Sequence, residues 1–245
     1  MIRKHIPNFS TSLNVLCGSV AVVFILKGVL TTGVFLIILA AVFDFFDGMS
    51  ARLLKAYSPI GKELDSLADM ISFGLAPGLI MFKLLETSLF KTEVIPDLQS
   101  NLTPGQLLIL GSAFLIPIFS ALRLAKFNVD ERQTSSFIGL PTPANALFIS
   151  SLALIQEHGN MPAIDNFLLT TPALIVITIL FSWLLVAEIP MFSLKFKNLS
   201  WKSNQVQYIF LFCSALLLSL LGLYGITAII PLFIGISVFR LRPGK

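Results

Sequence analysis

Charged residues and cysteines are both scarce in this sequence. Only 12% of the 245 residues are charged, against the roughly 25% that is typical of soluble domains. The two cysteines, Cys17 and Cys213, fall inside apolar stretches and lack the spacing of a zinc site or a disulfide framework. They are interpreted as small buried hydrophobic residues, and neither a disulfide nor a zinc site is indicated.

The basic residues also lack the clustering that nucleic-acid binding requires. The formal net charge is +4, but lysines and arginines occur singly or in twos and threes at the ends of apolar stretches. There they would meet anionic lipid head groups. Nucleic acid is therefore not an expected partner.

What the sequence has in abundance is apolar residues, which make up 56% of the chain. This composition predicts an all-α, polytopic integral membrane bundle of about eight transmembrane helices, forming a single membrane domain over residues 1–245. The fifth apolar stretch is short and polar and the first two nearly touch, so the number could fall to six or seven. The eight stretches are 12–31, 30–48, 63–86, 105–125, 140–156, 167–187, 206–222 and 224–240.

The distribution of lysine and arginine predicts the orientation in the cell membrane. With eight crossings and a cytoplasmic N-terminus, only Lys27, Lys83 and Lys91 of the 17 basic residues lie outside. This topology places both termini and the acidic residues discussed below on the cytoplasmic side. The segment through Phe9 has no convincing small-residue cleavage site after it, so we expect a retained interfacial segment.

Four aspartates stand beside strongly apolar sequence between residues 44 and 69. Asp44 and Asp47 are three residues apart and therefore share one helix face, and Asp65 and Asp69 are four residues apart on the next helix. The connection contains the helix-breaking pair Ser58-Pro59, so the two helices are expected to run antiparallel with their carboxylates facing one another. Burying these charges without a cation between them would cost several kcal/mol per ion, roughly 3–5 kcal/mol.

Oxygen ligands of this kind suit Mg²⁺, Mn²⁺ or Ca²⁺ rather than zinc or copper. Four negative charges balance two divalent ions, and two ions roughly 3.5–4 Å apart form a clamp for displacement at phosphorus. Gly48 and Ala51 lack bulk beside the aspartates, so a phosphate or nucleotide could approach the helix closely. The spacing predicts phosphoryl-type transfer at a membrane surface.

The full pattern Asp44-x2-Asp47-Gly48-x2-Ala51-Arg52-x8-Gly61-x3-Asp65-x3-Asp69 resembles the signature of the CDP-alcohol phosphatidyltransferases at every defined position. The resemblance implies a six-helix catalytic core, a homodimer, and a reaction in which an alcohol displaces CMP from a CDP-linked lipid with a divalent metal, Mg²⁺ or Mn²⁺. On this basis residues 1–195 are expected to form the core, and residues 196–245 to add two C-terminal transmembrane helices.

Further stretches resemble the type II phosphatidylserine synthases within that family. These stretches run from Pro7 to Gly18, from Asp65 to Pro77, from Ala121 to Asn128 and from Phe137 to Ala144. They imply CDP-diacylglycerol and L-serine as substrates and CMP as a product, in phospholipid biosynthesis. Glycerol 3-phosphate and inositol phosphate remain alternative acceptors, and a divalent-cation transporter remains an alternative of another class.

The resemblance also implies roles for individual residues. The metal ligands would be Asp44, Asp47, Asp65 and Asp69, with Asp69 also the general base. The CDP-lipid would contact Gly48, Ala51, Arg52, Asn14, Ser66 and Ser72, and the serine would contact Arg123 and Asn128.

Structural roles are the alternatives for several of these side chains. Arg52 could pair with a carboxylate, and Arg123 could be a snorkelling anchor at the membrane interface. Asn14 could cap or join helices, and Ser66 and Ser72 are ordinary in tight helix packing.

Overall fold

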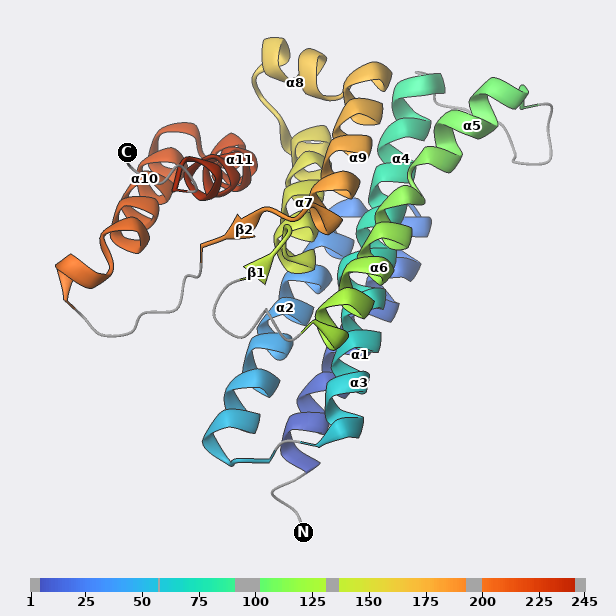
Figure 1. Ribbon diagram of the computed structural model, residues 1–245. Helices are drawn as coiled ribbons and strands as arrows, with labels where there is room; N and C mark the ends of the chain where they lie inside the picture. The colour runs from blue at the N-terminus through green and yellow to red at the C-terminus, as the bar shows by residue number, and fades with distance from the viewer. Residues whose placement is uncertain (1–4, 57, 91–101, 131–136, 193–199, 241–245) are drawn as a thin grey trace.

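The computed structural model describes residues 5–56, 58–90, 102–130, 137–192 and 200–240, and it is almost entirely helical (Figure 1). The predicted all-α membrane class is confirmed. The elements in chain order are α1 (His5–Leu26), α2 (Leu30–Leu53), α3 (Pro59–Asp69), the π-helix η2 (Met70–Leu75), α4 (Ala76–Phe90), α5 (Pro104–Ser112), α6 (Leu115–Val129), β1 (Phe137–Ile138), α7 (Thr142–His158), α8 (Pro162–Leu168), α9 (Thr171–Val186), β2 (Pro190–Met191), the 3-10 turn η4 (Trp201–Ser203), α10 (Gln205–Leu221) and α11 (Leu223–Arg240).

Among the described residues, four helical segments are long and apolar enough to cross a membrane, or five if the bent pair α8 and α9 forms one span. The four are Pro7–Leu26, Leu30–Leu53, Pro59–Phe90 and Pro104–Val129. α10 and α11 are apolar but shorter, with 17 and 18 residues. The predicted number of eight crossings is therefore not confirmed, while a multi-pass membrane protein is.

Part of the predicted orientation rests on residues outside those that the structure describes. The basic residues concerned are Arg3, Lys4, Lys91, Arg132, Lys195, Lys197, Arg242 and Lys245. The predicted core boundary at residue 195 also lies outside the described residues. The side of the membrane and the division of the chain at that point stay predictions.

The centre of the bundle is the rod formed by α3, η2 and α4, which continue as one segment of 32 residues. It begins where the sequence predicts a helix break, because the Ser58 side chain caps α3 by accepting a hydrogen bond from the Gly61 amide at 3.0 Å and Pro59 occupies the first turn. η2 then widens the helix for about one turn, directly after Asp69. Because a π-turn holds an extra residue, it changes which faces the following residues present.

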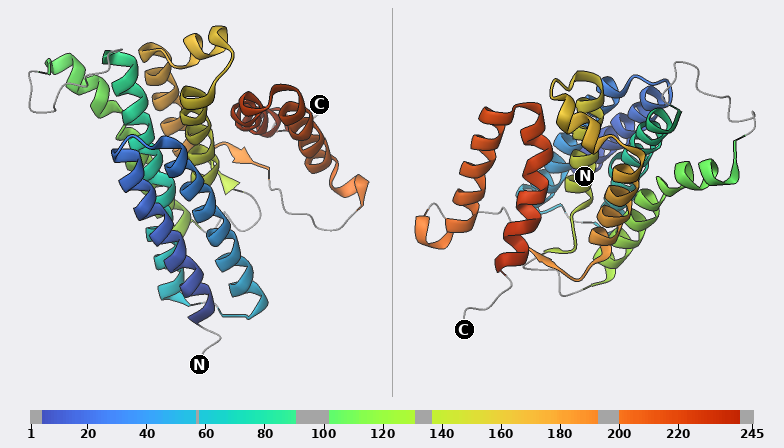
Figure 2. Two further views of the ribbon diagram at one scale, coloured as in Figure 1. Left: turned by 180° about the vertical axis from the view of Figure 1, so that it is seen from behind. Right: turned by 90° about the horizontal axis from the view of Figure 1, so that it is seen from above.

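α1 and α2 form an antiparallel hairpin that packs against this rod (Figure 2). The turn between them contains Gly28 with a φ of +79°, a conformation that glycine adopts without steric cost. Close packing of α1 on the rod is visible at Gly18, where an added Cβ would lie 2.9 Å from the Ser72 Cα atom. α1 is therefore placed to touch both helices that carry the aspartates.

The two short strands fix the start of α7. β1 and β2 pair in antiparallel register, Phe137 with Met191 and Ile138 with Pro190. The Leu140 amide then donates to the carbonyl of Leu184 on α9 at 2.8 Å. α7 then begins at Thr142, between Pro141 and Pro143. α10 and α11 lie to one side of the bundle (Figures 1 and 2), with α11 against α7.

Candidate active site

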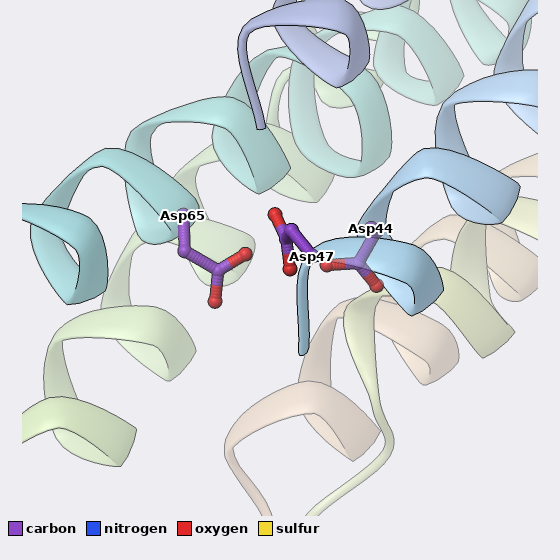
Figure 3. Close-up of side chains that lie close together, drawn as sticks. All are labelled: Asp44, Asp47 and Asp65. Atoms are coloured by element: carbon purple, nitrogen blue, oxygen red, sulfur yellow. The ribbon is translucent and has the colours of Figure 1, made fainter. Parts of the chain in front are cut away.

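Three of the predicted aspartates converge between α2 and α3. Oxygen atoms of Asp44 and Asp47, from the C-terminal part of α2, and of Asp65, from α3, all lie within 4.8 Å of one another. Figure 3 shows the three carboxylates turned toward the space between the two helices. The predicted antiparallel arrangement is thereby confirmed for these residues.

Asp69 lies one turn further along α3, next to this group of three but not within it. Its side chain is buried and accepts a hydrogen bond from Asn14 Nδ2 of α1 at 3.5 Å. It lines the same cavity as the other three aspartates. The four predicted carboxylates thus share one site.

The donor set fits a hard divalent cation. Asp47 is buried, and Asp65 Oδ1 is buried without a hydrogen-bond partner among the described residues. Within that part of the chain, no lysine or arginine nitrogen lies within 4.0 Å of the four carboxylates. Neighbouring carboxylates that lack a compensating charge are costly to bury, and a cation bound by their oxygens removes that cost.

The aspartates open into a cavity of about 620 Å³ between the ends of α1, α2, α3 and α6 and the start of α7. All the predicted site residues line it except Asn14 and Ser72. Those that do are Asp44, Asp47, Gly48, Ala51, Arg52, Asp65, Ser66, Asp69, Arg123 and Asn128. Residues far apart in the sequence are therefore brought to one cavity, as predicted from the motifs.

Asn14 and Ser72 lie behind the carboxylates. Both are fully buried, and the Ser72 hydroxyl donates to the Asn14 carbonyl at 3.1 Å while the Asn14 amide group faces Asp69. Their described contacts join α1 to the rod, which matches the alternative that Asn14 joins helices.

The side chains of Arg52, Asn128 and Arg123, which were predicted to contact the substrates, differ in their exposure and in their hydrogen-bond partners. Arg52 is exposed, and its Nε donates to the Gly48 carbonyl of its own helix at 2.9 Å. The Asn128 amide donates to Ser66 Oγ at 2.9 Å and thereby links α6 to α3. The backbone carbonyl of Asn128 accepts a hydrogen bond from the Lys62 ammonium at 2.7 Å. Lys62 is therefore a third cation at the cavity, beside Arg52 and Arg123, and the sequence reasoning missed it.

Arg123 is buried, with only 7% of its surface exposed, which is not the position of a snorkelling anchor. Its Nη1 donates to the Thr142 hydroxyl at 3.4 Å, and the guanidinium carbon lies 5.5 Å from the centre of the Phe127 ring. Its Nε is buried without a hydrogen-bond partner among the described residues. A buried guanidinium with a free donor beside a cavity is suited to bind an anion.

Thr11 is another residue that the sequence reasoning missed. Its hydroxyl lies 2.7 Å from Asp47 Oδ2, although the two residues are 36 positions apart. The only local signal is that Thr11 and Asn14 are three residues apart and share a face of α1.

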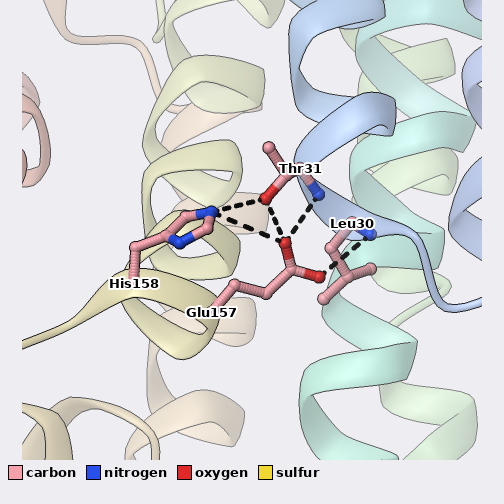
Figure 4. A network of polar contacts seen from close by, with 4 residues as sticks. All are labelled: Leu30, Thr31, Glu157 and His158. Atoms are coloured by element: carbon pink, nitrogen blue, oxygen red, sulfur yellow. Dashed lines mark hydrogen bonds and ion pairs between the residues drawn. The ribbon is translucent and has the colours of Figure 1, made fainter.

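A separate polar network lies at the opposite end of α2 (Figure 4). The Glu157 carboxylate, at the end of α7, accepts hydrogen bonds from the amides of Leu30 at 3.2 Å and Thr31 at 2.9 Å. The Thr31 hydroxyl contacts both Glu157 and His158. A carboxylate stabilises the unpaired amides at a helix N-terminus. The network therefore caps the N-terminus of α2, and this structural role accounts for it.

Comparison with known proteins identifies related sequences. The profile of a family described as CDP-alcohol phosphatidyltransferase matches residues 4–187. A CDP-diacylglycerol–serine O-phosphatidyltransferase of Bacillus subtilis is 34% identical over 140 residues, covering 57% of this chain and 70% of that protein. One of Methanocaldococcus jannaschii is 35% identical over 150 residues, covering 60% and 61%. An archaetidylserine synthase of Methanothermobacter thermautotrophicus is 30% identical over 160 residues, covering 64% and 61%.

Proposed function

The chain belongs to the CDP-alcohol phosphatidyltransferase family, and on that premise we propose that it transfers the phosphatidyl group of CDP-diacylglycerol to the hydroxyl of L-serine and releases CMP. Relatives at 34% and 35% identity are named for this reaction. The observation that carries the proposal of an anionic acceptor is Arg123, a buried guanidinium with a free donor that lines the same cavity as the aspartates. A small acceptor that bears a carboxylate matches it.

In this proposal Asp44, Asp47, Asp65 and Asp69 hold two divalent ions, Mg²⁺ or Mn²⁺. When bound, these ions neutralise the charge of the carboxylates and of the substrate diphosphate and acidify the attacking hydroxyl. The helices provide the rigid frame, because the carboxylates come from consecutive turns of α2 and α3 rather than from loops.

The chemical step is a direct displacement at phosphorus. The serine hydroxyl oxygen forms a bond to the phosphorus that carries diacylglycerol, and the bond from that phosphorus to the oxygen of CMP breaks. Asp69 accepts the proton of the hydroxyl, since it lines the cavity and is oriented by Asn14. CMP leaves, and phosphatidylserine remains in the membrane.

Substrate contacts divide between two walls of the cavity. On the α2 wall, Gly48 and Ala51 leave room for the CDP group, and a Cβ added to Gly48 would meet nothing within 4 Å. Arg52 would reach the diphosphate from the same helix. On the α6 wall, Arg123 would bind the serine carboxylate beside Asn128, whose amide donates to Ser66 of α3.

The membrane setting of the reaction is proposed from the charge distribution and the family. The cavity and both termini would face the cytoplasm of a multi-pass protein in the cell membrane, and two copies would form a homodimer. L-serine would enter from the cytoplasm and CMP would leave to it, while CDP-diacylglycerol would enter from the membrane lipids. Nucleic acid is not an expected partner.

The test is an acceptor panel with the purified full-length protein in lipid nanodiscs containing CDP-diacylglycerol. L-serine, glycerol 3-phosphate and inositol phosphate are supplied separately with Mg²⁺ or Mn²⁺, and CMP and the lipid product are quantified. Of the three acceptors, only L-serine should yield CMP and a lipid product, phosphatidylserine. A chelator should abolish the formation of both products. CMP release that does not depend on serine, or that another acceptor supports better, would remove serine as the substrate.

A further inference from the structure

Thr11 is the one residue of α1 whose side chain reaches the group of three carboxylates directly, among the residues that the structure describes. It is buried, with 2% of its surface exposed, and it lies on the cavity wall. Its hydroxyl oxygen is 2.7 Å from Asp47 Oδ2 and 3.0 Å from the Pro7 carbonyl oxygen. A hydroxyl has a single proton, and the nearer, charged acceptor takes it.

We propose that Thr11 is a positioning residue, which holds the Asp47 carboxylate toward Asp44 and Asp65 and thereby raises the affinity of this site for divalent cations. The inference rests on the proposed metal site and deepens it. No metal-ligand role is assigned to Thr11 itself. It acts through Asp47.

A device of this kind is needed because the three carboxylates repel one another before a cation binds. One oxygen from each lies within 4.8 Å of the others in a partly buried site, where like charges interact more strongly than in water. Asp47 could lower that repulsion by rotating away. The short hydrogen bond from Thr11 opposes the rotation, so less free energy is spent on reordering the ligands when the cation arrives.

α1 is itself tied to the helices that carry the aspartates. The Ser10 hydroxyl donates to the Phe43 carbonyl, next to Asp44 on α2, at 2.9 Å. One turn beyond Thr11, Asn14 contacts Asp69 from the same face. The donor of Thr11 is therefore held in place by contacts on both sides of it along α1.

The competing explanation is that Thr11 only fills space and bonds to its own helix through Pro7. Thr11→Val distinguishes the two, because it keeps the shape of the side chain and removes the hydroxyl. Thr11→Ser restores the hydroxyl. A matched control is Thr178→Val on α9, where a fully buried threonine donates only to the Leu174 carbonyl of its own helix at 2.7 Å.

The experiment measures Mn²⁺ binding to chelator-stripped, full-length protein in nanodiscs by the electron paramagnetic resonance signal of free Mn²⁺. Thr11→Val should weaken binding by about 10-fold or more, the range in which outer partners of metal ligands usually act. Thr11→Ser and Thr178→Val should bind like the wild type. In parallel, activity of Thr11→Val should recover at high Mn²⁺ toward the wild-type kcat.

If Thr11→Val does not fold, Thr11→Ala provides the second variant, and it should show the same weakened binding. Wild-type affinity in a folded Thr11→Val or Thr11→Ala protein would overturn the positioning role while leaving the metal site standing. Equal weakening by Thr178→Val would also overturn it. Absence of Mn²⁺ binding by the wild type would overturn the metal site and this inference together.

Discussion

Replacing Gly18 with alanine should disturb the site from a distance. A Cβ at this position would overlap Ser72 Oγ and would lie 2.9 Å from Ser72 Cα, where ordinary contact begins at 3.4 Å. The hydroxyl could turn aside, but it would then lose its hydrogen bond to the Asn14 carbonyl. The backbone of Ser72 cannot turn aside in the same way, so α1 and η2 must separate by about half an ångström.

The expected losses of stability and of rate in Gly18→Ala follow from the overpacking and from the two donors, Thr11 and Asn14, that α1 holds at the site. Overpacking of this kind costs roughly 1–3 kcal/mol of stability. Because Asn14 and Thr11 move with α1, their donors shift relative to Asp69 and Asp47. A misplacement of ~1 Å can cost ~100-fold in rate, so a loss of about tenfold is expected for the smaller shift here.

The assay is serine-dependent CMP release per folded protein, with the melting temperature measured in the same nanodiscs. Gly235→Ala on α11 is the matched control, because a Cβ there would meet nothing within 4 Å and alanine favours a helix interior. A Gly18→Ala protein with wild-type rate and melting temperature would refute the close packing of α1 on the rod and its role in placing the donors.

Three further substitutions probe the two substrate walls and the far end of α2. Gly48→Val should fold normally, since a Cβ there meets nothing within 4 Å, but it should raise KM for CDP-diacylglycerol; an unchanged KM would place the CDP group elsewhere. Arg123→Gln should raise KM for serine at least about tenfold, or ~1.4 kcal/mol, with a much smaller change for the lipid; equal changes in both would argue against a serine contact. Glu157→Gln should lower the stability by about 1 kcal/mol through the cap of α2 and leave the rate per folded protein unchanged, as melting and CMP release would report.

The convergence of the aspartates could be predicted because it depends on local geometry. Helical spacing places Asp44 with Asp47, and the break at Ser58-Pro59 turns α3 back along α2. The subgroup motifs likewise placed Arg123 on the wall of the cavity. Each of these features belongs to one continuous stretch of the chain, from Asp44 to Asp69 for the aspartates and from Ala121 to Asn128 for Arg123.

The remaining features depend on interactions between distant segments. The bond from Thr11 to Asp47 and the burial of Arg123 follow from how the helices pack, which no short pattern states. The same holds for Asn14, whose amide faces a carboxylate rather than the cavity. The number of membrane crossings could not be predicted either. The apolar stretches over α10 and α11 form helices that are shorter than the spans of the central bundle, and helix length is not stated by an apolar pattern.

The proposed transfer depends above all on divalent cations bound by the aspartates. The decisive experiment measures Mn²⁺ binding and serine-dependent CMP release on one chelator-stripped preparation, with the wild type and Asp65→Asn compared. In the wild type, bound Mn²⁺ and rate should rise together, and Asp65→Asn should lose both by more than the ~10–100-fold typical of an outer partner. A wild type that works at full rate in chelator, or an Asp65→Asn protein that binds Mn²⁺ and turns over normally, would disprove the metal dependence proposed for this site.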